Sequence, residues 1–239
     1  MLHLIPTPIG NLEDITLRAL RVLREVEVVL AEDTRNTRLL LKHYEIGARV
    51  ESYHKDNEHV RVRGLAERLA GGEEMALVSD AGTPGVSDPG YLLVRACIEE
   101  GVAVECLPGA TAVVPALVAS GLPCERFCFE GFLPHKKGRQ TRLRALAEEE
   151  RVTVLYESPH RLRKTLAELV AVMGRERKAC VCRELTKVHE EYARGSLGEL
   201  AAHFEAVEPR GEIVIVLDRK GGEAPEGGAE REEREDCEE

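Results

Sequence analysis

The chain has 239 residues, of which 43% are hydrophobic, which is enough apolar material for one large domain or two smaller ones. Its apolar runs are short, such as residues 213–217, and fall well below the roughly 20 residues that a membrane-spanning helix needs. The chain begins directly with a strand-like segment, without the basic and small-residue regions of an export signal. We therefore expect a cytoplasmic protein with no membrane segment.

Charge is distributed unevenly along the chain. The formal net charge is −10, but residues 221–239 hold nine acidic residues and two arginines, so the first 220 residues carry only −3. A segment so rich in Gly, Glu and Ala cannot offset the entropy of ordering, and we predict that residues 221–239 form a disordered acidic tail. Residues 131–144, in contrast, contain no acidic residue and five basic ones, which are Lys136, Lys137, Arg139, Arg142 and Arg144. This basic segment indicates a nucleic-acid partner.

Strand-like apolar runs alternate with helix-period segments through the first half of the chain. We predict strands at residues 2–5, 26–31, 75–79 and 102–107, and helices near residues 16–24, 37–44, 60–70 and 91–100, with a further helix from Thr111. Such alternation predicts a sheet with helices on its faces.

The segment Gly121-Leu122-Pro123 interrupts this pattern, which restarts with a strand near residues 127–131. The second half then indicates a helix at 139–149, a strand at 153–156, a helix at 159–173, strands at 179–184 and 190–195, a helix at 197–204 and a strand at 212–217. We therefore predict two α/β domains, residues 1–120 and 121–220.

Three loops that follow predicted strands are rich in glycine and proline: residues 6–11 (PTPIGN), 80–90 (DAGTPGVSDPG) and 108–112 (PGATA). Open α/β sheets bind ligands at the carboxyl ends of their strands, where proline stiffens a loop and glycine lets backbone approach a ligand closely. Any one of these loops by itself is better explained as an ordinary turn. Together they predict a cofactor site that works mainly through main-chain groups. Neither the GxGxxG nor the GxxxxGK[ST] motif occurs, which argues against the common dinucleotide and triphosphate sites.

Five longer runs are more specific: residues 7–16 (TPIGNLEDIT), 31–35 (AEDTR), 79–85 (SDAGTPG), 156–161 (YESPHR) and 183–187 (RELTK). Together they resemble the ribosomal RNA small subunit methyltransferase I family, over about residues 1–218. That family belongs to the tetrapyrrole methylase superfamily. The resemblance implies two α/β domains with S-adenosylmethionine in the cleft between them.

The resemblance also implies the substrate and the site. The substrate is expected to be the ribose 2′-hydroxyl of a cytidine in the decoding centre of 16S rRNA, within the small ribosomal subunit, and the protein is expected to be a homodimer. The cofactor-binding residues expected by motif are Pro8, Gly10, Asp80, Ala81, Gly82, Pro108, Ala110, Ala112, Glu157, Ser158, Gly211, Glu212 and Ile213. No metal ion is expected, because the seven cysteines lack CxxC spacing and read as reduced thiols.

In the implied reaction a ribose oxygen attacks the methyl carbon of a sulfonium, so positioning contributes most and a base contributes less. Candidates for the proton transfer are Glu32, Asp33, His54, Glu184 and Lys187. Glu184 and Lys187 are three residues apart and, in a helix, would share a face. An exposed ion pair explains these two residues equally well.

The expected phosphate contacts are Arg35, Lys136, Lys137, Arg139, Arg142, Arg161, Arg163 and Arg183, which would position RNA without reading its sequence. For any one of them the alternative is a solvated basic surface. Two other functions stay open from the sequence. The chain could methylate a small molecule such as a corrin precursor, or it could be a ribosome-assembly factor that binds RNA and cofactor without catalysis.

Overall fold

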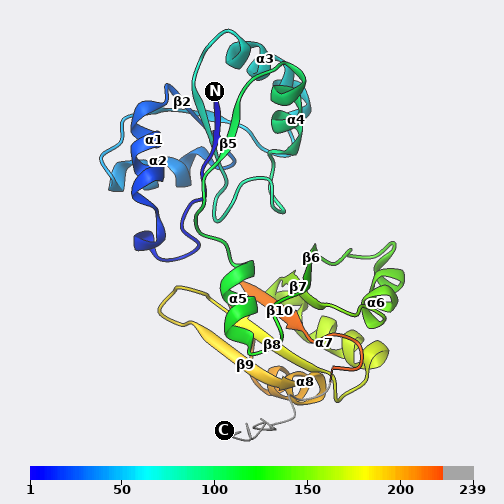
Figure 1. Cartoon of the computed structure of the whole chain (residues 1–239). Coiled ribbons are helices and arrows are strands. Elements are labelled where there is room, and N and C mark those ends of the chain that lie inside the picture. Colours follow the sequence, from blue (N-terminus) through cyan, green and yellow to red (C-terminus); the bar gives the residue numbers. More distant parts are fainter. Residues whose placement is uncertain (223–239) are drawn as a thin grey trace, which may run out of the picture.

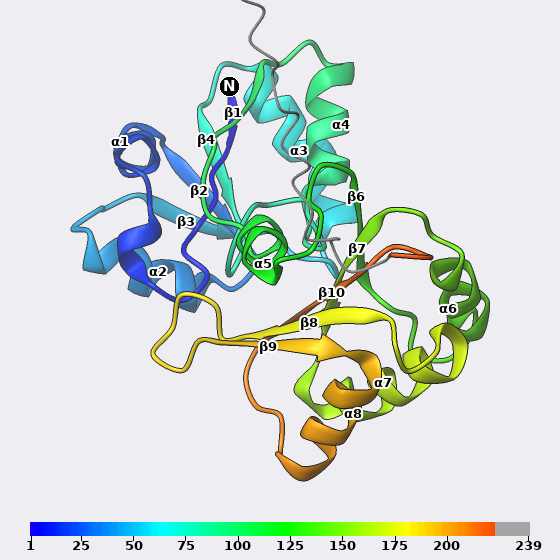
Figure 2. The same cartoon turned by 60° about the horizontal axis from the view of Figure 1, so that its bottom comes forward.

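The computed structural model describes residues 1–222, so the predicted tail from residue 223 onward lies outside the described residues. Two five-stranded sheets, each with its own helices, make up the molecule (Figures 1 and 2). The first half contains β1 (Leu2–Leu4), the 3-10 helix η1 (Leu12–Asp14), α1 (Leu17–Glu25), β2 (Val28–Ala31), α2 (Thr34–His43), β3 (Arg49–Ser52), α3 (Glu58–Ala70), β4 (Met75–Val78), α4 (Tyr91–Glu99), β5 (Val104–Cys106) and α5 (Val113–Ser120). The second half contains β6 (Phe127–Phe132), α6 (Arg139–Ala147), β7 (Val152–Glu157), α7 (Pro159–Met173), β8 (Lys178–Arg183), β9 (Glu191–Ser196), α8 (Leu197–Ala206) and β10 (Ile213–Leu217).

The first sheet is parallel throughout and has the strand order β3-β2-β4-β1-β5. All residues of β2 and β4 are buried, as expected for parallel strands that are covered on both faces. Because side chains alternate along a strand, Val29 and Ala31 of β2 pack with α1 and α2, whereas Val28 and Leu30 pack with α3 and α4. The two helix pairs accordingly lie on opposite sides of this sheet (Figure 1).

The second sheet is mixed and has the order β6-β7-β10-β8-β9. Only β6 and β7 are parallel to each other, while β10 runs antiparallel to both of its neighbours. Leucines of α6 and α7 and Phe204 of α8 pack on one face, and α5 covers the other. The fold class predicted from the sequence, two α/β units, is confirmed.

Helix α5 is the element whose packing differs from the predicted division of the chain. The predicted boundary at residues 120/121 groups α5 with the first sheet, yet Val113, Ala116 and Leu117 pack against Val154 and Cys182 of the second. Figure 1 shows α5 beside β8 and β10, beyond the end of the first sheet. The change of packing partner therefore falls in the loop between β5 and α5, a loop that the sequence analysis assigned to the cofactor.

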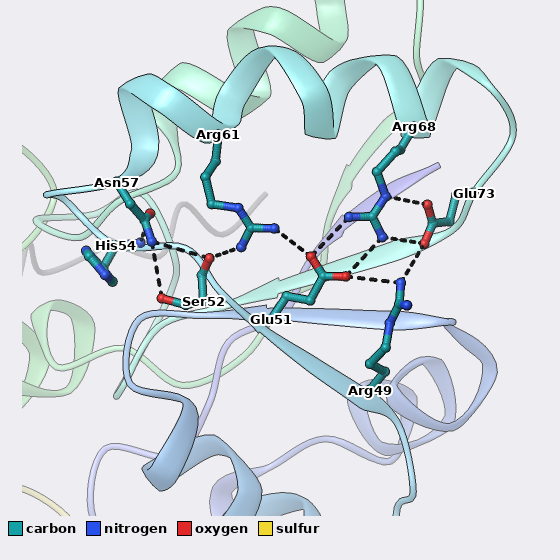
Figure 3. Close-up of polar contacts among 8 residues, drawn as sticks. All are labelled: Arg49, Glu51, Ser52, His54, Asn57, Arg61, Arg68 and Glu73. Carbon is teal, nitrogen blue, oxygen red and sulfur yellow. Dashed lines mark hydrogen bonds and ion pairs between the residues drawn. The ribbon is translucent and has the colours of Figure 1, made fainter.

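The edge strand β3 is joined to α3 by an ion network (Figure 3). Glu51 accepts hydrogen bonds from Arg61 at 2.6 Å and from Arg68 at 3.0 and 3.1 Å, and Arg68 also donates to Glu73 at 2.7 Å. Hydrogen bonding to Arg68 holds the pKa of Glu51 down, to about 2. The network holds the start of α3 in place and, with it, the loop that carries His54.

Candidate functional site

A cavity of about 450 Å³ lies between the two sheets. Its walls are the loops that follow β2, β4, β5 and β7, the end of β6, and the loop that precedes β10. This volume is within the usual range for small-molecule sites, about 300–1,000 Å³. Nine residues expected from the sequence line it: Asp80, Ala81, Gly82, Ala112, Glu157, Ser158, Gly211, Glu212 and Ile213.

The other four expected cofactor residues, Pro8, Gly10, Pro108 and Ala110, do not line this cavity. All four belong to the first and third Gly/Pro loops, whose residues Ile9, Thr111 and Ala112 do line it. The amides of Thr7 in the first loop and Gly82 in the second each donate to the other's carbonyl at 2.9 Å. The Ala110 carbonyl of the third loop accepts from the hydroxyl of Thr83 in the second at 3.2 Å. The three Gly/Pro loops therefore form one hydrogen-bonded unit.

Gly82 is the glycine on which this unit most depends. Its φ is +78°, in the left-handed region that only glycine adopts freely. A Cβ placed there would lie 3.6 Å from Cγ2 of Ile9 and 3.9 Å from the Ala110 carbonyl oxygen. Any larger side chain at this position would project between the first and third loops, where the cavity begins.

Three carboxylates, Glu32, Asp80 and Asp88, face the cavity from the first sheet. Burial raises the pKa of Asp88 to about 6, helped by the negative charges of Glu32 and Asp80 and opposed by a hydrogen bond with Ser79. Burial likewise raises the pKa of Glu32, with Asp80 adding to the effect and His54 opposing it. The site is thus an acidic pocket that favours a cationic ligand. Asp88 lies in a loop singled out from the sequence, but its burial could not be inferred there.

Aromatic residues form the opposite side of the cavity. Tyr156 of β7 lies between two rings of β6, with centroids 5.0 Å from Phe129 and 5.6 Å from Phe132. Burial raises the pKa of Tyr156 to about 12, so its hydroxyl stays protonated. Phe132 is 55% exposed although it lines the cavity. No role was expected for either residue: Tyr156 belongs to the run 156–161 that carries the family resemblance, and Phe132 follows the strand predicted near residues 127–131.

Glu157, expected to bind the cofactor, is the centre of a buried network. Only 3% of the residue is exposed, and its carboxylate accepts from Thr165 at 2.5 Å, pairs with Arg161 at 2.6 Å and lies 4.0 Å from Arg139. Arg139 is itself 4% exposed, pairs with Glu168 at 2.7 Å and donates to the Pro134 carbonyl at 3.1 Å. The prediction that Arg139 contacts RNA phosphates is therefore wrong, because its guanidinium is enclosed in the protein.

The remaining expected phosphate contacts are placed differently. Arg35, Arg142 and Arg183 pair with Asp33, Glu130 and Glu191, and Arg163 donates to the Phe204 carbonyl. Arg161 is partly buried against Glu157. Lys136 and Lys137 are exposed, and neither has an acidic partner among residues 1–222. These two lysines, in the loop between β6 and α6, and Arg144 of α6 are the exposed cations of the predicted basic segment that have no acidic partner among the described residues.

Glu184 and Lys187 occur in the turn between β8 and β9 and not in a helix, since Glu184 and Thr186 have positive φ values of 50° and 65°. Lys187 Nζ nevertheless donates to Glu184 at 2.8 Å and to Glu212 at 2.9 Å. The hydrogen bonds that Glu184 accepts from Lys187 and from the Glu212 amide lower the pKa of Glu184. The pair packs so tightly that a Cβ on Gly10 would overlap Lys187 and one on Gly211 would overlap Glu184. The pair thus clamps the first loop against the loop before β10, beside the cavity and outside its lining.

Asp33 and His54 are also outside the lining. The Asp33 carboxylate caps α2 and pairs with Arg35 at 2.6 Å, and that hydrogen bonding lowers its pKa to about 2. Such a group is a weak proton acceptor. His54 lies in the β3–α3 loop, where its amide donates to Asn57 at 2.9 Å (Figure 3). Of the five candidates for proton transfer, only Glu32 lines the cavity.

Within residues 1–222, no three His, Cys, Asp or Glu side chains are grouped so that they could hold a metal ion. The same part of the chain has no helix that is both long and apolar enough to cross a membrane.

Comparison with known proteins defines the class first. The family model of the tetrapyrrole (corrin/porphyrin) methylases matches residues 1–201, and the chain belongs to this family. Solved structures agree on the fold: a cobalt precorrin-4 methyltransferase superposes with a TM-score of 0.65 at 20% identity, over 91% of this chain and 94% of that one. A uroporphyrin-III C-methyltransferase from Thermus thermophilus in complex with S-adenosylhomocysteine gives a TM-score of 0.63 at 23% identity, over 91% and 96% of the two chains.

Curated relatives narrow the class further. The chain is 49% identical to the ribosomal RNA small subunit methyltransferase I of Synechocystis, over 95% of this chain and 80% of that protein. It is 47% identical to the protein of the same name from Thermotoga maritima, over 92% and 98% of the two chains. For the Escherichia coli O157:H7 protein of that name the identity is 50%, over 91% and 77%. Within the methylases, the chain is thus a member of the ribosomal RNA small subunit methyltransferase I group.

Proposed function

We propose that this protein transfers a methyl group from S-adenosylmethionine to the ribose 2′-hydroxyl of a cytidine in the decoding centre of 16S rRNA. The observation that carries the proposal is the identity of 47–50% with relatives named as small-subunit rRNA methyltransferases, across more than nine-tenths of the chain. The acidic cavity at the strand ends supplies a place for the cofactor. The exposed lysines of the β6–α6 loop supply a surface for RNA.

The cavity fits S-adenosylmethionine in shape and charge. The cofactor carries a positive sulfonium and an ammonium group, and Glu32, Asp80 and Asp88 provide the complementary negative field. Gly82 and Gly211 keep side chains out of the lining, so backbone at residues 80–82 and 211–213 would hold the adenosyl and methionyl parts. The cofactor supplies an already activated methyl group, which leaves positioning as the main task of the protein.

Asp88 is the proton acceptor that we assign to the reaction. An effective base has a pKa close to the working pH, and Asp88, at about 6, is ionised at neutral pH but still basic enough to accept a proton. Asp33, held at about 2 by Arg35, lacks this property. In this assignment Asp88 takes the proton of the ribose hydroxyl as the oxygen attacks the methyl carbon.

The preferred substrate in this proposal is the assembled small ribosomal subunit. The first 220 residues have a net charge of −3, so nonspecific attraction to RNA is weak, and recognition depends on a shaped surface. From the family resemblance we further propose a cytoplasmic homodimer, which light scattering of the purified protein would test.

The test is methyl incorporation from labelled S-adenosylmethionine into three acceptors at equal concentration and salt: small subunits, the same rRNA stripped of protein, and a corrin precursor. We expect incorporation into subunits, much less into bare rRNA, and none into the corrin precursor. Transfer to the corrin precursor alone would replace the proposal by small-molecule methylation. Binding of subunits without any transfer would favour a ribosome-assembly factor.

A further inference from the structure

Phe132, the last residue of β6, has an aromatic side chain that remains largely exposed. It lines the cavity, and yet 55% of the residue remains open to solvent. Its neighbour Leu133 is 1% exposed, so the strand end itself is well anchored in the core. Tyr91 and Phe127 are also exposed, and Phe132 differs from them in lining the cavity. Burying such a ring against a ligand that enters the cavity is favourable.

Two arginines donate hydrogen bonds to the backbone that directly follows Phe132. Arg161 donates to the Leu133 carbonyl at 3.4 Å, and Arg139 donates to the next carbonyl, that of Pro134, at 3.1 Å. Both arginines are fixed by the Glu157 network, and the Tyr156 ring lies 5.6 Å from the Phe132 ring at an angle of 60°. The exposed ring is thus presented by a well-supported element, which keeps the entropic cost of ligand contact low.

The segment that follows Phe132 and Leu133 in the chain is cationic and exposed. Lys136 and Lys137 follow within five residues, both exposed and both without an acidic partner among the described residues. Three acidic residues of the cavity, Glu32, Asp80 and Asp88, come from the loops of the first sheet, after β2 and β4. The two from the second half, Glu157 and Glu212, are each paired with a cation, Arg161 and Lys187. An aromatic ring next to unpaired cations is the combination that binds unstacked nucleotides: the ring stacks on the base, and the cations bind phosphates.

We propose that Phe132 is the stacking platform for the base of the target nucleotide, with Lys136 and Lys137 binding the flanking phosphates. The inference rests on the proposed function and adds the side from which RNA reaches the cavity. Stacking accepts any base, so Phe132 would fix the distance and angle of the ribose and leave base identity to other contacts. It is a positioning residue for the substrate and not for the cofactor.

The experiment compares Phe132→Ala, Phe132→Trp and Phe127→Ala. Phe127 is the matched control, because it begins the same strand, is 39% exposed and does not line the cavity. Two quantities are measured for each variant: kcat/KM for methyl transfer to small subunits, and the Kd for S-adenosylmethionine by calorimetry. Base–aromatic stacking predicts a loss of about 5- to 150-fold in kcat/KM for Phe132→Ala, with the cofactor Kd changed by less than about twofold.

Phe132→Trp should recover most of the activity, since the indole also stacks, and Phe127→Ala should behave as the unsubstituted protein. Unchanged kcat/KM for Phe132→Ala would overturn the inference. A parallel rise in the cofactor Kd would also overturn it, by assigning the ring to the adenine of the cofactor. If the unsubstituted protein transfers no methyl group to subunits, the proposed function fails, which is separate from failure of Phe132→Ala alone.

Discussion

The two walls of the cavity differ in chemical character. The N-terminal wall, made of Glu32 and residues 80–88, is acidic and built from loops stiffened by glycine and proline. The C-terminal wall, made of Phe132 and residues 156–159, is aromatic, lies next to exposed lysines and depends on a buried ion network. The difference indicates a division of labour in which the first wall attracts the cationic groups of the cofactor and the Phe132 rim of the second wall receives an anionic polymer. Substitutions can therefore disrupt each wall separately.

The largest expected effect comes from removing Glu157, the centre of the C-terminal wall. Glu157→Ala removes the carboxylate that pairs with Arg161 and accepts from Thr165, while Arg139 keeps its partner Glu168. Breaking a buried ion pair in this way costs up to about 3–5 kcal/mol. We expect that loss of unfolding free energy in urea denaturation. Glu148→Ala is the control, because Glu148 pairs with Lys220 at the surface, where an ion pair contributes little to stability. Equal losses in both variants would contradict the role of Glu157.

Gly82→Val breaks the N-terminal wall. The side chain would enter the space between Ile9 and Ala110 with an unfavourable positive φ, and we expect cofactor affinity to fall by at least about 100-fold. Gly85→Val is the matched control: Gly85 is in the same loop, has φ +83° and has no atom within 4 Å of its added Cβ. Calorimetry with S-adenosylmethionine separates the two variants. A similar loss for Gly85→Val would mean that backbone strain, and not occupied space, is responsible.

Asp88→Asn tests the chemistry between the walls. Activity of the unsubstituted protein should rise as the pH increases through about 6, where Asp88 loses its proton. Asp88→Asn should lack this rise and be about 10²- to 10⁴-fold slower.

The same substitution should change the pH dependence of stability. Because the pKa of Asp88 is raised in the folded protein, Asp88 loses its proton first in the unfolded chain, and it destabilises the fold increasingly from about pH 4 to pH 6. Asp88→Asn should thus gain on the order of 1 kcal/mol at pH 7.5, allowing for solvent screening. An Asp56→Asn control, at an exposed position, should change neither profile.

The smallest effect is expected at the rim of the C-terminal wall. Replacing Lys136 and Lys137 by alanine should reduce the slope of log affinity for RNA against log salt by about 0.7–0.9 for each lost phosphate contact. Cofactor affinity should stay the same. The control removes Lys178 and Arg219, two exposed cations at the opposite end of the second sheet from the cavity. An unchanged slope for the lysine pair would place the RNA elsewhere.

The loops of the N-terminal wall could be predicted from residue type, for a physical reason. Glycine and proline impose local backbone conformations, so the three loops could be recognised from composition and from their position after strands. The C-terminal wall depends on burial, which is a tertiary property. Arg139 looked like a phosphate contact because its neighbours are basic, yet it is 4% exposed and pairs at 2.7 Å with Glu168, 29 residues later in the chain.

Dependence on tertiary structure also explains the remaining differences between the sequence predictions and the structure. Glu184 and Lys187 are paired as their spacing indicated, but a turn with positive φ brings them together where a helix was considered. Helix α5 follows the first-half pattern in sequence, while its apolar residues pack on the second sheet. Asp88 and Phe132 carry no motif that distinguishes them from their neighbours, and only burial and exposure in the folded chain reveal their properties.

The most direct test of the whole account is mass spectrometry of nucleosides from 16S rRNA, in cells with and without this protein. We expect one cytidine of the decoding centre to lose a methyl group from its ribose when the protein is absent. Reintroduction of the unsubstituted chain should restore the modification, and the Gly82→Val variant should not. An rRNA modification pattern that is identical in the presence and absence of the protein would contradict the proposed methylation of 16S rRNA.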